Sequence, residues 1–303
     1  MSVQREVRYG AQTSHFAFDR NVTPVAQANS GDTVLFHCQD CYDGQITHDG
    51  MDFARLDVTR TNPVTGPLYV TGAEPGDVLK VEIQRIEIAD YGVMCVKDGW
   101  GICTVEGSHC RRFPIRDGKI LFDGGLKLPV RPMIGVIGTA PATGTISTQT
   151  PGEHGGNMDI CELGEGCTIY LPVAVSGALL SMGDIHGVQG DGESASCAME
   201  TSGRVTVRVT VQKDAMDLPT PMIETDRAYC TTAADASLDV CSVAAARKMH
   251  RWLMSRWDMT DTQAAMLLSL QGNLRISQVV NPRKGCMMEL KKELLAQWKI
   301  SQT

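Results

Sequence analysis

The chain has 303 residues, of which 43% are hydrophobic, and its 28 Lys and Arg against 35 Asp and Glu give a formal net charge of −7. This composition is too apolar for a disordered protein, and the acidic balance argues against a protein that coats nucleic acid or an anionic membrane. No stretch approaches the roughly 18 consecutive apolar residues of a membrane-spanning helix, and the first residues lack the apolar core of a secretion signal. We therefore expect a cytoplasmic protein with one large or two modest domains.

The first part of the chain carries the alternating pattern of short β-strands. An apolar, β-branched run at Thr33–Cys38 predicts one strand, and valines at every second position predict another over residues 204–212. Residues 79–83 also alternate, and the alternation slips at Arg85, which indicates a β-bulge. Shorter strands are expected at residues 119–122 and 173–182. Many short strands separated by glycine and proline favour a sandwich or barrel-like β architecture.

After about residue 225 the pattern changes from strands to helices. Residues 238–257 have the composition and spacing of an amphipathic helix, and Thr260 with Gln263 forms a capping box that begins a second helix, which Gly272 ends. Two strand-like pieces follow, at residues 274–280 and 286–291. We predict a mainly β body, residues 1–220, and a C-terminal α+β portion, residues 221–303. The predicted fold class is thus mainly β, sandwich or barrel-like, and overall α+β.

Eleven cysteines in a chain with no expected secretion signal favour reduced thiols that pack as small hydrophobic groups over a disulfide framework. Cys38 and Cys41 form a single CxxC pair, and without a second pair at zinc-ribbon spacing they are a weak signal for a redox or zinc site. Cys197 lies near acidic residues, whereas a thiol nucleophile needs a neighbouring base or positive charge. The cysteines are therefore weak candidates for function.

Histidine and acidic residues that could bind a ligand are concentrated in two glycine-rich segments, residues 151–159 and 183–193. Glycine tolerates positive φ and lets backbone and side chains approach a small ligand closely. Asp184 and His186 are two residues apart, so on an extended strand their side chains would share a face, and Asp191 and Glu193 repeat this spacing. A histidine and carboxylates on one face are suitable ligands for zinc or a similar divalent cation.

The same segments have a simpler interpretation as surface turns. In Gly-Asp-Gly-Glu stretches the aspartate commonly binds backbone amides and the glutamate is solvated. Neither segment matches a zinc-protease helix, a phosphate-binding loop or a nucleophile elbow. From spacing alone, a metal site and a pair of surface turns both remain open.

Four sequence motifs, in one order along the chain, resemble motifs of the acetamidase/formamidase family. They are Asn62-Pro63-Val64-Thr65-Gly66-Pro67, Gly72-Ala73-Glu74-Pro75-Gly76-Asp77-Val78-Leu79, His154-Gly155-Gly156-Asn157-Met158-Asp159 and the segment 183–193. The resemblance extends over most of the chain. It implies a predominantly β fold, a divalent metal, homo-oligomeric assembly, and hydrolysis of a short aliphatic amide, of the formamide or acetamide type, to a carboxylate and ammonia.

Carried over onto this sequence, the resemblance implies a site of several polar residues. The expected metal ligands are His154, Asp159, Asp184 and His186, the expected catalytic groups are Glu193, Glu200 and Asp40, and Asn157 and Asp191 are expected to bind the substrate. We expect zinc, with calcium as a candidate for a second, structural ion, and a homodimer or larger homo-oligomer. The expected partner is a small amide, and neither nucleic acid nor membrane. The alternative is a catalytically divergent relative that serves as a metal-stabilised binding protein for a small solute.

Overall fold

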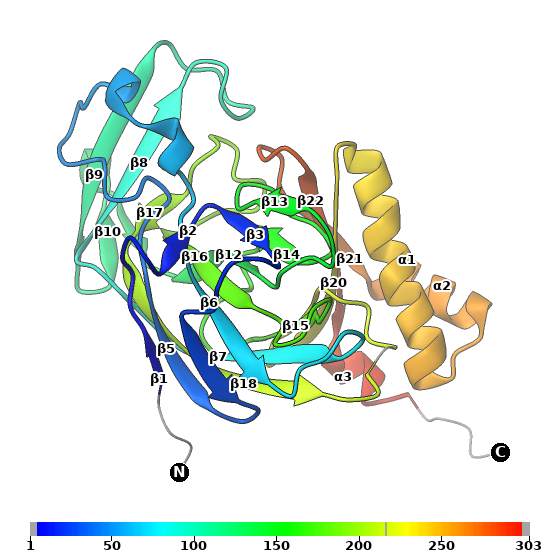
Figure 1. The fold of residues 1–303 in the computed structure, drawn as a ribbon. Helices are drawn as coiled ribbons and strands as arrows, with labels where there is room; N and C mark the ends of the chain where they lie inside the picture. Colours follow the sequence, from blue (N-terminus) through cyan, green and yellow to red (C-terminus); the bar gives the residue numbers. More distant parts are fainter. Residues whose placement is uncertain (1–4, 216, 299–303) are drawn as a thin grey trace.

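The computed structural model describes residues 5–215 and 217–298, which form two large sheets with a hydrophobic core between them (Figure 1). Within these residues the first sheet has nine strands. In spatial order they are β1 (Arg5–Val7), β5 (Thr33–Cys38), β18 (Gly203–Gln212), β7 (Val78–Ile88), β15 (Thr168–Pro172), β19 (Met222–Glu224), β20 (Ala228–Asp235), β22 (Lys284–Lys291) and β21 (Asn273–Gln278).

The second sheet has eleven strands within the described residues. Its main path runs β11 (Lys127–Pro129), β10 (Lys119–Leu121), β9 (Ser108–Arg116), β8 (Tyr91–Lys97), β17 (Met199–Thr201), β16 (Leu180–Val188), β12 (Met133–Gly138) and β14 (Gly155–Asn157). β6 (Val64–Thr71) pairs with β16 and also with β2 (Ser14–His15) and β4 (Ala26–Asn29). A separate ribbon joins β3 (Ala17–Asp19) and β13 (Thr145–Ser147). The α-helices are α1 (Leu238–Trp257), α2 (Asp261–Gln271) and α3 (Lys292–Leu295), and 3-10 turns occur at Phe53–Arg55, Val58–Arg60 and Asp123–Gly125.

Alternation of apolar and polar residues explains the main strands. In β18 Val205, Val207 and Val209 are fully buried, while the arginines and threonines between them are partly or fully exposed. The register between β7 and β18 shifts where Thr206 faces Arg85 and Val207 faces Ile83, so the predicted bulge is confirmed. The predicted class, mainly β and overall α+β, is also confirmed, and the described sheets are open rather than closed into a barrel.

The main hydrophobic core lies between the two sheets. The nine-stranded sheet contributes side chains such as Phe36 and Leu79, and the eleven-stranded sheet contributes Ile134 and Met182. Burial of an apolar side chain of this size stabilises the fold by roughly 1.5–3 kcal/mol. This packing holds β16 and its neighbour β12 in place within the second sheet.

α1 and α2 lie against one end of the nine-stranded sheet, beside β20–β22 (Figure 1). The side chain of Ser237 caps the N-terminus of α1, and the helix buries Met249 and Trp252 against the sheet. The predicted capping box of α2 is confirmed, since Thr260 and Gln263 exchange side-chain to backbone hydrogen bonds. None of the helices in the described ranges is long and apolar enough to cross a membrane.

The predicted strand over residues 173–182 is wrong for residues 173–179, whereas residues 180–182 begin β16. The chain turns between β15 and β16, and Ala178 and Leu179 within this turn have positive φ, which no regular strand contains. The turn is apolar because its Val175 and Leu179 pack with Tyr69. Burial of the turn, and not pairing in a sheet, accounts for the apolar residues there.

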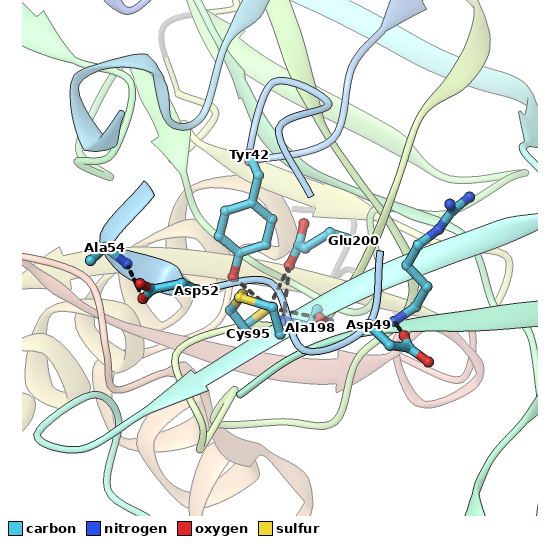
Figure 2. The surroundings of a disulfide bond; sticks show 10 residues. Tyr42, Asp49, Asp52, Ala54, Cys95, Ala198 and Glu200 are labelled. Carbon is cyan, nitrogen blue, oxygen red and sulfur yellow. Dashed lines mark hydrogen bonds between the residues drawn. A yellow bond between two sulfur atoms is a disulfide. The ribbon is translucent and has the colours of Figure 1, made fainter. Parts of the chain in front are cut away.

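The expectation of reduced cysteines is wrong for one pair. Cys95 on β8 and Cys110 on β9 face each other in antiparallel register and form a disulfide. Tyr42 and Glu200 lie beside this disulfide (Figure 2). Eight of the nine free cysteines are buried and Cys103 is exposed, so packing as small hydrophobic groups fits most of the others.

Strands from both sides of residue 220 belong to the nine-stranded sheet. β15 pairs with β19, whose residues follow the predicted boundary, and β19 continues the sheet into β20. The division into residues 1–220 and 221–303 stays a prediction.

Candidate active site

The two glycine-rich segments meet at a cavity of about 610 Å³. Asp184 and His186 come from β16, and Glu200 comes from its neighbour β17. Asp159 follows β14, and Glu193 lies in the loop between β16 and β17. The four carboxylates line the cavity, and the buried imidazole of His186 lies among them. The structure therefore brings together five of the predicted site residues.

His186 is at the centre of this cluster. Its Nε2 lies 3.2 Å from Asp184 Oδ1, 3.3 Å from Glu200 Oε2 and 4.0 Å from Asp159 Oδ1. Its Nδ1 lies 2.8 Å from Gln189 Oε1, and Gln189 is fixed in this orientation because its Nε2 donates to the carbonyl of Asp159 at 2.8 Å. Nδ1 therefore carries the hydrogen, and the Nε2 lone pair of neutral His186 points at three carboxylates. Only a proton or a cation can bind this lone pair there.

Burial governs the ionisation of the cluster, because more than nine tenths of each of the five residues is removed from water. It raises the pKa of Asp159 and of Glu200 well above the ordinary carboxyl range, and it raises the pKa of Glu193 to about 8. Burial also opposes the charged forms of Asp184 and His186. The nearby opposite charges outweigh it, so the pKa of Asp184 is lowered and that of His186 is raised. Four acids thus share one base, and a cation that displaced their protons would stabilise the cluster.

Three of these acidic residues have backbone conformations that residues other than glycine rarely adopt. The φ angles are +47° at Asp159, +56° at Asp184 and +45° at Glu193. Such conformations cost about 1–3 kcal/mol each, persist only where the surroundings enforce them, and cluster at functional sites. Asn281 Nδ2 donates to Asp159 Oδ2 at 2.5 Å, and Asn62 Nδ2 donates to Asp184 Oδ2 at 3.0 Å. These amides hold the two aspartates in position.

The donor atoms of the cluster fit a divalent cation. Two groups of three residues have ligand atoms within 4.8 Å of one another: Asp159, His186 and Glu193, and Cys41, Asp184 and Glu200. Imidazole, carboxylate and thiolate ligands suit zinc and similar transition metals. Together with the orientation of His186 Nε2 and the excess of buried acids, this donor set supports the predicted metal centre.

Asn157, which was predicted to bind substrate, also lines the cavity. With its amide nitrogen turned toward the acids, that nitrogen lies 3.1 Å from Asp159 Oδ1 and 3.2 Å from Asp184 Oδ2. In this orientation its oxygen accepts a hydrogen bond from Asn281 Nδ2 at 3.1 Å. Asn157 therefore places a carboxamide directly beside the carboxylates.

Three predicted site residues, His154, Asp191 and Asp40, lie outside the lining of the cavity. His154 is buried against the edge of Phe18, and neither ring nitrogen has a hydrogen-bond partner in the described part of the chain. Burial lowers the pKa of His154 to about 4. Their predicted roles stay predictions, and the cavity itself is formed without them.

Asp191 and Glu193 do not share a face, although their spacing suggested it. Gly192 and Glu193 both have positive φ, so the chain turns between the two acids instead of continuing as a strand. Arg275 binds the carboxylate of Asp191 with nitrogen–oxygen distances of 2.8 and 2.9 Å, while Glu193 lines the cavity. The spacing rule fails here because it assumes an extended backbone.

Several residues that hold the cluster were not predicted, namely Gln189, Asn62, Asn281 and Gly135. The sequence does carry a signal for Gly135, because an isolated glycine inside the apolar run of β12 indicates close approach of another group. A Cβ atom at this position would lie 2.7 Å from Asp184 Oδ2 and 2.8 Å from Asp159 Oδ1. Gly135 therefore forms the floor of the cluster.

Cys197 is a poor nucleophile in this structure. The residue is buried, its Sγ lies 3.0 Å from the Tyr42 hydroxyl, and burial raises the pKa of the thiol well above its usual range. The thiolate, which is the reactive form, is therefore disfavoured. This agrees with the interpretation of the sequence, in which Cys197 lacks the neighbouring base or positive charge that a nucleophile needs.

We predict that Gly135→Ala lowers the free energy of unfolding by about 1–3 kcal/mol, because the added methyl group overpacks the floor of the cluster. It should also weaken the binding of zinc at least tenfold, since both aspartates must move. Urea denaturation and zinc titration measure the two effects. Gly10→Ala is the control, because its Cβ would meet no atom closer than 3.6 Å. Equal behaviour of the two variants would contradict the packing argument.

We also predict that Asp40→Asn stabilises the fold at neutral pH but not at pH 4. Burial raises the pKa of Asp40 from 3.8 to about 6, so the folded state loses stability as the pH rises through this range. Asp40 Oδ1 accepts both backbone hydrogen bonds, from Tyr42 and Gly44, and asparagine can keep them. The unfolding free energy of the variant should exceed that of the wild type by about 2–3 kcal/mol at pH 7.5.

Urea unfolding at both pH values measures this difference, and an equal difference at pH 4 and pH 7.5 would contradict it. Activity assays on the same folded variant test the other role predicted for Asp40. Loss of activity despite higher stability would support a catalytic role for its carboxylate.

Comparison with known proteins agrees with the resemblance. Residues 1–112 and 138–291 match the model of the Acetamidase/Formamidase family. The crystal structure of an acetamidase from Bacillus halodurans is 39% identical, with a TM-score of 0.94 over 97% of this chain and 100% of that chain. A formamidase from Methylophilus methylotrophus is 28% identical over 285 residues, with 71% of this chain and 70% of that protein covered. For a Schizosaccharomyces pombe relative, 29% identical over 257 residues, the chain spans 63% of its length.

The matched residue ranges include every predicted site residue, and the structural match covers nearly the whole chain. Formamidase and acetamidase are both names of enzymes that hydrolyse the carbon–nitrogen bond of an amide, so the predicted amidohydrolase class agrees with the class of these relatives. This chain belongs to the acetamidase/formamidase family.

Proposed function

We propose that the protein hydrolyses short aliphatic amides, of the formamide or acetamide type, to a carboxylate and ammonia with the help of a divalent metal ion. One observation carries the proposal: the buried Nε2 of His186 faces three carboxylates at 3.2 to 4.0 Å beside a cavity. The relatives named formamidase and acetamidase support the substrate class.

Asp159, Asp184 and His186 would hold the ion. Zinc is our first candidate because it accepts mixed imidazole and carboxylate ligands, and a divalent ion of this kind polarises a carbonyl and lowers the pKa of water when bound. Gln189 contributes by holding the His186 ring with its Nδ1–H occupied, so that Nε2 stays free to ligate. Asn62 and Asn281 contribute by holding the two aspartates.

Glu193 is our candidate for the general base. It lines the cavity, and its pKa of about 8 lies close to the range in which a base works best near neutral pH. It would take a proton from the water that attacks the carbonyl carbon and give it to the departing nitrogen, so that ammonia leaves and the carboxylate remains. Glu200 is the second candidate, because it also lines the cavity and its Oε2 lies 3.3 Å from His186 Nε2.

Asn157 would orient the substrate. Its carboxamide lies beside Asp159 and Asp184 and offers both a donor and an acceptor, as a primary amide requires. A site that pairs both ends of an amide rejects ligands that lack them, because its own polar groups would then be left buried and unpaired.

The alternative of a metal-stabilised solute-binding protein has less support, since the relatives are named as amidases. A second, structural calcium ion, assembly into a homodimer or larger oligomer, and a cytoplasmic location stay predictions.

Glu193→Gln should lower kcat for ammonia release by roughly 10²- to 10⁴-fold, because glutamine cannot accept the proton, and should change KM by only a few fold. Glu153→Gln is a matched control from the other glycine-rich segment, because Glu153 is exposed and pairs with Lys248. Ammonia release from formamide and acetamide measures both variants. Near-wild-type turnover in Glu193→Gln would remove this residue from the role of base.

Gln189→Leu should weaken zinc binding by about 10- to 100-fold, because leucine fills a similar volume but no longer orients His186. Competition with a chromophoric chelator measures the affinity of the metal-free protein for zinc. Gln27→Leu is the control, since Gln27 is exposed on β4. An unchanged affinity in Gln189→Leu would contradict the assignment of His186 Nε2 as a ligand.

A further inference from the structure

The connection between β8 and β9 forms part of the wall of the cavity. Trp100 in this connection lines the same cavity as Asp159 and Asp184. The indole ring is held in place by the edge of Phe53, with ring centroids 4.7 Å apart at 84°, and by Lys97 Nζ at 5.6 Å from the Trp100 centroid. Trp100 therefore presents a fixed aromatic surface to whatever enters.

The cavity is larger than formamide or acetamide requires. Its volume is about 610 Å³, whereas a molecule of four heavy atoms fills on the order of 100 Å³, judged from the 30 Å³ that one water occupies. Besides the polar cluster, its lining includes apolar surface from Trp100, Val280 and Pro282. The amide group of a substrate is polar and a larger acyl group is apolar. The polar cluster can bind the amide group, and the apolar lining can bind the acyl group.

The same connection also holds the loop that carries Glu193. Ile102 N donates to Ser194 O at 2.8 Å, and a Cβ atom at Gly101 would lie only 2.3 Å from Ser194 O. On its other side the loop is fixed by Gly192 N, which donates to Ser277 O at 3.0 Å. The left-handed backbone of Glu193 is thus enclosed between two sets of contacts.

We propose that the segment 100–102 is a specificity-determining and positioning element of the site, and that the substrates include primary amides whose apolar acyl group is larger than acetyl and reaches Trp100. This inference rests on the proposed amide hydrolysis and extends it. Trp100 binds the acyl group. Gly101 and Ile102 act through Glu193, because they fix the loop on which Glu193 stands.

The first test is a substrate series of acetamide, propionamide, isobutyramide and benzamide, assayed by ammonia release. In the wild type, kcat/KM should be at least tenfold higher for one of the two largest amides than for acetamide. Trp100→Ala should reduce this ratio at least tenfold, mainly through KM for the larger amide. A ratio near one in the wild type, or one that Trp100→Ala leaves unchanged, would overturn the inference.

The second test compares Gly101→Ala with Gly107→Ala, which lies in the same β8–β9 connection. The two glycines have nearly equal φ angles, +70° and +72°, so alanine is similarly strained at both, but only at Gly101 would the Cβ meet the Glu193 loop. Gly101→Ala should lower kcat at least tenfold for every amide in the series with little change in KM, and Gly107→Ala should stay within twofold of the wild type. Equal kcat values in the two variants would overturn the positioning role.

The two tests separate failure of this inference from failure of the proposed function. If the wild type releases ammonia from acetamide but shows no preference for larger acyl groups, amide hydrolysis stands and the inference fails. If the metal-loaded wild type releases no ammonia from any amide in the series, both fail. Thermal melting identifies a Gly101→Ala variant that does not fold, and the substrate ratio of Trp100→Ala then decides.

Discussion

Four buried carboxylates surround a single imidazole, and the rest of the site lowers the electrostatic cost of burying these acids together. A buried charge without a partner costs several kcal/mol, and His186 can neutralise only one of the four acids. Burial disfavours the charged forms of Asp159, Glu193 and Glu200, and the neighbouring acids add repulsion, so the pKa of all three is raised and protons stabilise them. A divalent cation would relieve it better, and the lone pair of His186 Nε2 already points to where it would bind.

The fold supplies the rigidity that such a cluster needs. β16 and β12 are neighbours in the eleven-stranded sheet and contribute side chains to the main core, and Gly135 on β12 leaves room for Asp159 and Asp184. The strained backbone of Glu193 is fixed by contacts from the β8–β9 connection on one side and from β21 on the other. Side chains used in this way are best placed on rigid elements that support one another.

The sequence predicts local structure where a regular pattern applies along a single element. The valines of β18, the bulge in β7 and the capping box of α2 are such cases. Asp184 and His186 do lie together, but Asp184 has a φ of +56°, so the extended-strand rule does not explain their contact. Prediction fails where the backbone leaves the regular conformation or where partners come from other strands. Asp191 separates from Glu193 because of positive φ angles, and the Cys95–Cys110 disulfide depends on the register between β8 and β9. The resemblance to a family supplied Glu200 and Asn157, which no spacing rule connects to His186.

The most direct test of a divalent ion at His186 is anomalous diffraction at the zinc absorption edge from crystals of the zinc-loaded protein. The proposal predicts one strong peak about 2.0–2.1 Å from His186 Nε2, with carboxylate oxygens of Asp159 and Asp184 at about 2.0–2.2 Å. A strong peak at another position, such as beside His154, with none at His186 would contradict it. Protein that holds no metal at this cluster and still releases ammonia from amides would contradict it as well.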